Sequence, residues 1–169
     1  FFKKIIKSPL RQNTFEECPA DGLERRDTDT DILIPYNILG EQKLARLAAL
    51  AKRTFTTVAA DSEYTVRGLS EAAVSHDVTF NVLVEIEMGF KRTGTTSPAR
   101  GAELAKLVES LDGLNLRGLM GFPTPPECRP SIQESIFLFD KAGLPHDVVS
   151  GGSTKSALQA HEIPELTEY

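Results

Sequence analysis

Apolar positions between residues 31 and 169 follow two different spacings, and each spacing predicts one kind of element. Short runs rich in Ile, Val and Leu predict buried strands, and apolar residues three and four positions apart predict helices with one buried face. The predicted strands are 31–36, 54–60, 80–89, 114–122 and 146–152, with a further strand beginning in 165–169. The predicted helices are 40–53, 63–76, 97–111 and 129–143.

Residues at the ends of these helices support the boundaries. Asp61 and Ser62 precede the second helix, where Asp and Ser are preferred N-caps. Ser97 and Pro98 form a cap followed by proline at the first helical position, and Gly143 is placed to end the last helix. The four helices are therefore predicted by their ends as well as by their periodicity.

Strands and helices alternate along the chain, which predicts parallel strands joined by right-handed crossovers. No GxGxxG follows the first predicted strand, so a dinucleotide-binding fold has no positive support. A complete (β/α) barrel takes about 250 residues, with about 200 as the lower bound, and this chain has 169. We therefore predict an α/β fold, an incomplete (β/α) TIM-type barrel over residues 30–169. Residues 1–29 are interpreted as an irregular N-terminal segment that keeps a remnant of the first barrel strand.

Composition and charge narrow the classes of partner. The chain is 40% hydrophobic, carries a net charge of −5 and has a pI near 5.3, which argues against nucleic acid or an anionic membrane. No apolar run approaches the ~20 residues that span a bilayer. Two isolated cysteines and three scattered histidines predict no metal site and a reducing, cytoplasmic setting; they are Cys18, Cys128, His76, His146 and His161.

Candidate chemistry lies where strands end, because reactive groups of α/β barrels lie at the carboxyl ends of their strands. Arg92 follows the strand 80–89 on a glycine-bounded loop, so its guanidinium can donate to a phenolate, carboxylate or phosphate. The alternative is a surface arginine paired with a nearby glutamate. Gly121 ends the next strand and would let a ligand approach closely, or it only ends that strand.

The stretch "VSGGST" follows the last predicted strand. Gly151 and Gly152 leave backbone N–H groups open to an anion, and the hydroxyls of Ser153 and Thr154 add donors. Barrel phosphate sites lie in comparable loops. An ordinary Gly-Gly turn followed by a helix cap explains the same residues equally well, so both interpretations stay open on the residues alone.

Taken together, several segments resemble one family of pyridoxal-phosphate proteins, the D-threonine aldolase and D-serine dehydratase group. The segments are "DILIPYNILG", "VAADS", "VEIEMGFKRTG" (84–94), "LRGLMGFPTPP" (116–126), "VSGGST" (149–154) and "AHEIPELTEY" (160–169). The resemblance covers residues 30–169. It implies the alanine-racemase-like fold, whose N-terminal domain is a (β/α)8 barrel.

The resemblance also implies roles. Arg92 matches the arginine that contacts the cofactor ring oxygen, and Gly151, Gly152, Ser153 and Thr154 match the loop that holds the cofactor phosphate. The implied activity is that of a pyridoxal 5'-phosphate-dependent lyase acting on D-amino acids, in which the pyridoxal ring takes up the electrons of a broken bond at Cα.

Lys4 falls where the family has the lysine that bonds the cofactor aldehyde, within a motif close to H-x-K-x-x-K-[SC]-P. Lys7, Ser8 and Pro9 follow the motif, but Phe2 replaces the histidine and Ile6 a polar residue. A basic N-terminus exposed to solvent is the alternative for these lysines.

Two further departures separate the chain from the family pattern. Between Gln12 and Asp31 the family has a helix, a strand and a helix, whereas this chain has a polar stretch, so about one β/α unit is missing or rewritten. The chain also stops before the family's "RxGTY" segment and its C-terminal domain, where any divalent metal ligands would lie. These departures favour an alternative function, that of a non-catalytic cofactor-binding or degenerate relative. A weaker alternative is an unrelated barrel that binds a sugar phosphate.

The predicted barrel also bears on the oligomeric state. An incomplete barrel exposes sheet edges, so we expect a homo-oligomer.

Overall fold

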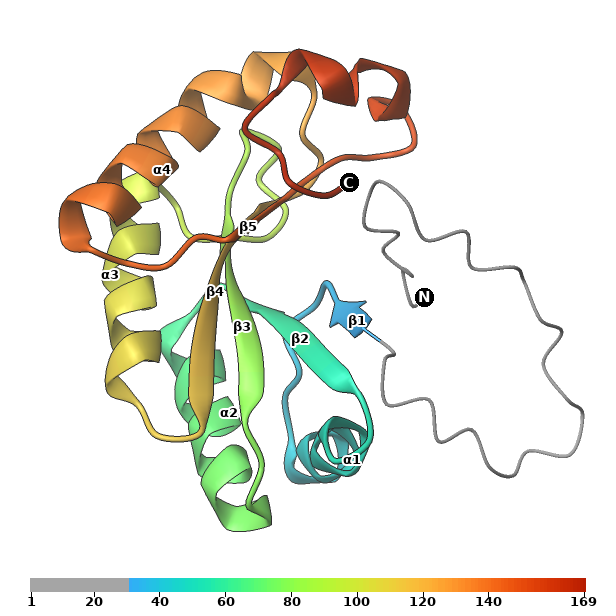
Figure 1. The fold of residues 1–169 in the computed structure, drawn as a ribbon, viewed down its shortest axis with the longest axis vertical. Helices are drawn as coiled ribbons and strands as arrows, with labels where there is room; N and C mark the ends of the chain where they lie inside the picture. Colours follow the sequence, from blue (N-terminus) through green and yellow to red (C-terminus); the bar gives the residue numbers. More distant parts are fainter. Residues whose placement is uncertain (1–30) are drawn as a thin grey trace, which may run out of the picture.

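The structure, a computed structural model, describes residues 31–169, which form a curled half-barrel of parallel strands (Figure 1). The strands are β1 (Asp31–Ile34), β2 (Phe55–Ala60), β3 (Phe80–Ile86), β4 (Leu114–Gly121) and β5 (Val148–Ser150). They lie in the sheet in their chain order, and every neighbouring pair is parallel. The prediction of an incomplete α/β barrel is confirmed. Lys4 and the segment 1–29 lie outside the described residues.

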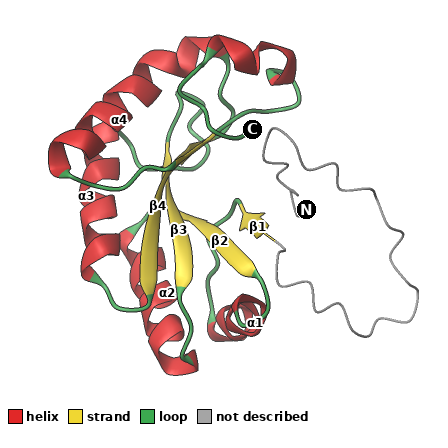
Figure 2. Ribbon diagram, viewed as in Figure 1, coloured by secondary structure: helices red, strands yellow, loops and turns green. Residues whose placement is uncertain are grey.

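One helix connects each strand to the next, and the four helices cover the outer face of the sheet (Figure 2). They are α1 (Glu41–Ala51), α2 (Glu63–His76), α3 (Pro98–Ser110) and α4 (Arg129–Ala142). Two short 3-10 helices, η1 (Pro126–Cys128) and η2 (Ala157–Glu162), follow β4 and β5. This repeated crossover carries the carboxyl end of every strand to the same rim of the half-barrel.

The helix ends form as their residues predict. The Ser62 hydroxyl accepts the N–H of Thr65 at 3.4 Å, and the Ser97 hydroxyl accepts that of Arg100 at 3.3 Å. Gly143 ends α4 in the left-handed conformation, with φ of 66°. Local side-chain hydrogen bonds and one glycine therefore set these boundaries.

Two groups of buried side chains lie on the two faces of the sheet. The larger packs the sheet against the helices and includes Val84 and Phe139. The smaller lies on the inner face and consists of Leu33, Ala59, Leu83 and Met120, with Phe122 and Val148 packed against it. Successive residues of a strand face opposite sides, so Glu85 shares the inner face with Leu83.

The chain after η2 returns to the edge of β5. The N–H of Thr167 donates to the carbonyl of Val149 at 3.0 Å, and Ser150 and Glu168 form an isolated parallel bridge. The predicted strand in 165–169 thus occurs as a single bridge beside β5.

Candidate functional site

Arg92 lies at the carboxyl-end rim between two aromatic residues from other loops. Its Nη2 donates to the hydroxyl of Tyr36 at 3.1 Å. Its Cζ lies 4.7 Å from the ring centroid of Phe122 and 5.8 Å from that of Tyr36, within the range of a cation–π contact. Among residues 31–169, no carboxylate forms an ion pair with Arg92. The alternative of an arginine paired with a glutamate therefore does not describe this loop.

A small hollow of about 60 Å³ opens at this rim on the inner face of the sheet. It is lined by Leu33, Pro35, Tyr36, Arg92, Met120, Gly121, Phe122, Ser150 and Gly151. We call residues 151–154 the glycine-rich loop. The structure thus brings Arg92 and the beginning of this loop to one hollow, although they are far apart in the sequence. Tyr36 belongs to the same site and was not predicted from the sequence.

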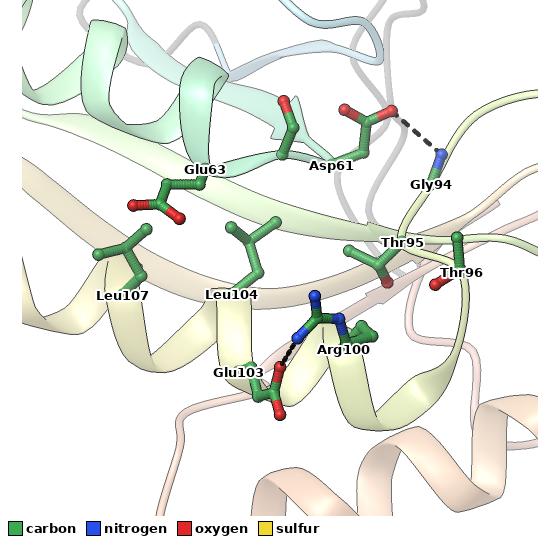
Figure 3. Close-up of a pocket in the computed structure, with 10 residues that line it drawn as sticks. Asp61, Glu63, Gly94, Thr95, Thr96, Arg100, Glu103, Leu104 and Leu107 are labelled. Carbon is green, nitrogen blue, oxygen red and sulfur yellow. Dashed lines mark hydrogen bonds and ion pairs between the residues drawn. The ribbon is translucent and has the colours of Figure 1, made fainter.

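Three carboxylates hold the loop that carries Arg92. The Thr93 hydroxyl donates to Glu85 at 2.5 Å, and the N–H of Lys91 donates to Glu87 at 2.6 Å. The N–H of Gly94 donates to Asp61 at 3.2 Å (Figure 3). The guanidinium of Arg92 is therefore carried by a loop that is fixed on both sides of it.

Glu85 is a buried acid in this arrangement, with 2% of its surface exposed. Burial is the main cause that raises the pKa of Glu85, and the negative charge of Asp61 adds to it. The hydrogen bond from Thr93 and the positive charge of Arg92 act in the opposite direction. The alternation of β3 places Glu85 on the inner face, and that alternation is the sequence signal by which it could be found.

The glycine-rich loop is anchored by hydrogen bonds within the chain. The N–H of Gly151 donates to the Glu168 carbonyl at 3.1 Å, and the N–H of Gly152 donates to the Thr124 hydroxyl. The Ser153 hydroxyl accepts the N–H of Ser156 at 3.2 Å, so it caps the turn before η2. Among the described residues, the backbone N–H groups that have no partner in this loop are those of Ser153 and Thr154.

A larger hollow of about 450 Å³ lies outside the barrel, between α2 and α3 (Figure 3). Leu104 and Leu107 form its apolar wall, and Arg100 is paired with Glu103 at 2.5 Å. It adjoins the Arg92 loop through the contact between Asp61 and Gly94. Its size alone does not make it the functional site, since Arg92 and the glycine-rich loop meet elsewhere.

Two properties of the described part of the chain concern membranes and metal ions. None of its helices has the length and hydrophobicity that crossing a bilayer requires. Within residues 31–169, His, Cys, Asp and Glu side chains do not gather in groups of three or more that could hold a metal ion.

These features define the class of the described domain. It is a partial parallel (β/α) barrel that carries an arginine loop and a glycine-rich loop at its carboxyl-end rim. The family model that describes the alanine racemase N-terminal domain matches residues 20–167. The chain belongs to this family.

Similar proteins include two curated enzymes. The chain is 28% identical over 141 residues to a D-threonine aldolase of an Arthrobacter species and to a 3-hydroxy-D-aspartate aldolase of Paracoccus denitrificans (strain Pd 1222). Each match covers 75% of this chain, but only 37% and 36% of the respective relative. The matched part of the chain thus spans little more than a third of these relatives' length.

Solved structures agree with the fold. The D-threonine aldolase of Filomicrobium marinum superposes with a TM-score of 0.71 at 28% identity, covering 81% of this chain and 41% of that one. An alanine racemase of Clostridium difficile 630 superposes with a TM-score of 0.60 at 19% identity, covering 76% of this chain and 35% of that one. The second match shows the fold alone.

Proposed function

We propose that this chain forms the cofactor-binding barrel of a pyridoxal 5'-phosphate-dependent lyase that acts on D-amino acids, of the D-threonine aldolase and D-serine dehydratase kind. The observation that carries the proposal is the meeting of Arg92 and Gly151, the first residue of the glycine-rich loop, at one hollow on the inner rim. The names of the two aldolase relatives support a D-amino acid as the substrate.

The residues at the rim fit the two anionic groups of pyridoxal phosphate. Arg92 donates one hydrogen bond to Tyr36 and forms no ion pair within residues 31–169, so other guanidinium N–H groups are available to the ring oxygen. The N–H groups of Ser153 and Thr154 are available to the phosphate. Phe122 offers an aromatic face beside Arg92.

In this proposal the cofactor supplies the chemistry, and the residues of the chain bind and orient the cofactor. The bound cofactor would supply the electron-accepting ring that makes cleavage at Cα feasible. Tyr36 and the carboxylates that hold the Arg92 loop orient the guanidinium toward the ring oxygen. Gly151, Gly152, Ser153 and Thr154 provide the loop for the phosphate.

Lys4 is proposed as the lysine that bonds the cofactor aldehyde. A lysine in an apolar pocket has a depressed pKa, so its amine is nucleophilic near neutral pH. Because Lys4 lies outside the described residues, this proposal rests on the motif resemblance alone.

Covalent trapping of the cofactor tests the proposal. The full chain is incubated with pyridoxal phosphate, reduced with borohydride and digested, and the modified lysine is located by mass spectrometry. We expect one adduct, on Lys4, that disappears in Lys4→Ala and persists in the matched control Lys7→Ala. Replacing Arg92 by Gln should weaken binding before reduction. No adduct, or adducts spread over many lysines, would contradict the proposal.

A second assay separates an enzyme from a non-catalytic relative that binds the cofactor. If the chain forms the Lys4 adduct and a separate, unreduced sample with pyridoxal phosphate releases glycine from D-threonine or pyruvate from D-serine, the chain is a lyase. If the adduct forms and the unreduced sample releases neither product, the chain is the non-catalytic alternative.

A further inference from the structure

Thr124 links the loop after β4 to the glycine-rich loop after β5. Its side chain is almost fully buried, with 1% of the residue exposed. Its hydroxyl oxygen accepts the backbone N–H of Gly152, which is 28 positions away in the chain. The bond joins two neighbouring loops of the rim, and Thr124 itself is not among the residues that line the inner hollow.

Gly151 and Gly152 both allow the contact with Thr124, each for a different reason. A Cβ at position 151 would lie 2.7 Å from the Thr124 hydroxyl oxygen and 2.8 Å from a methyl group of Leu166. Gly152 has φ of +115°, a conformation that other residues rarely adopt. Gly151 therefore admits the Thr124 side chain, and Gly152 turns its N–H onto that side chain.

We propose that Thr124 is a positioning residue for the anion-binding end of the site. By holding Gly152, it sets the direction of the chain that follows, and so places the free N–H groups of Ser153 and Thr154 for a phosphate group. The N–H of Gly152 is used up in this bond, so the glycine contributes its conformation. This inference rests on the proposed function and assigns a role to a residue that does not touch the ligand.

Two substitutions separate the hydrogen bond from the packing. Thr124→Val keeps the shape of the side chain but leaves the N–H of Gly152 without an acceptor, whereas Thr124→Ser keeps the hydroxyl. The test compares binding of pyridoxal phosphate, of pyridoxal, which lacks the phosphate, and of inorganic phosphate to the full chain. We expect Thr124→Val to weaken binding of pyridoxal phosphate and inorganic phosphate about tenfold, and to leave pyridoxal within about twofold. Thr124→Ser should bind all three like the parent chain.

A second measurement needs no cofactor. Hydrogen exchange of the Gly152 amide, followed by NMR on the unliganded protein, should be slow in the parent chain and in Thr124→Ser and faster in Thr124→Val. If the Val variant does not fold, Thr124→Ala removes the same acceptor with a smaller side chain and serves in its place.

The outcomes are distinguishable. If the parent chain binds no pyridoxal phosphate, the proposed function fails and this inference fails with it. If the parent binds and the folded Val or Ala variant binds equally well, only the role of Thr124 is overturned. It is also overturned if pyridoxal and pyridoxal phosphate weaken equally, because the residue then supports the fold without a special effect on the phosphate.

Discussion

The hydrogen bond between Thr93 and Glu85 allows a direct test of how the Arg92 loop is held. Thr93→Val keeps the shape of the side chain and removes the donor. Glu85 is only 2% exposed, so water cannot replace the lost bond easily. A hydrogen bond to a charged group contributes about 1.5–3 kcal/mol. We therefore expect the free energy of unfolding to fall by about this amount where Glu85 is ionised.

The loss should depend on pH with a definite sign. Burial is the main cause that raises the pKa of Glu85 above 4.5, so its contribution to stability is complete below the unfolded pKa and is lost as pH rises through the folded pKa. The Thr93 bond lowers this pKa and so limits the loss. Without the bond, stability falls further at high pH. At low pH, where Glu85 is protonated in both states, the cost is that of a neutral hydrogen bond, about 0.5–1.5 kcal/mol.

Urea denaturation of each variant, followed by circular dichroism near pH 4 and near pH 8, measures both values. Thr93→Ser retains the hydroxyl and is the matched control, and Glu85→Gln removes the titrating group. No loss at either pH in Thr93→Val would show that the loop does not depend on this bond. Equal losses at the two pH values would contradict the expected link between this bond and the ionisation of Glu85.

Three further results are expected. Phe139→Ala empties a fully buried position and should lower the free energy of unfolding by about 3–5 kcal/mol, whereas Phe137→Ala, at a position 63% exposed on the same helix, should change it by less than about 0.5 kcal/mol in the same urea assay. Glu165→Gln weakens the two-oxygen contact with Arg129, which is partly exposed, so stability should change little. Amide exchange at Gly151 should still accelerate, because its N–H donates to the carbonyl of Glu168, three residues after Glu165. Light scattering should show an oligomer, because an incomplete barrel has open sheet edges, and a uniform monomer would contradict that expectation.

Helices were the part of the fold that the sequence predicted best, because their ends depend on neighbouring residues. The second helix spans Glu63–His76, the predicted range, with Ser62 as its cap. Strand β5 was predicted over 146–152 but spans Val148–Ser150, where it pairs with Gly118–Met120. Its length is set by a partner distant in the sequence, which no local pattern contains.

The sequence likewise predicted some residues of the site and missed others. Position at strand ends pointed to Arg92 and to Gly151, and both line the inner hollow. Tyr36 and Thr124 were missed because their partners are 56 and 28 positions away, and neither has a periodic or compositional signal. The phosphate role of the glycine-rich loop stays a prediction.

The rim of the half-barrel is held by bonds between adjacent loops. Each bond joins the loop after one strand to the next loop in the sheet, and none of them needs the barrel to close. The pairs are Asn37 with Asp61 at 3.3 Å, Asp61 with Gly94 at 3.2 Å, Met88 with Cys128 at 3.4 Å, and Thr124 with Gly152. Because these contacts run from β1 to β5 without a gap, the position of Arg92 relative to Gly151 depends on them and on the sheet between. The contacts that shape the site therefore lie entirely within the five described strands and the loops that follow them.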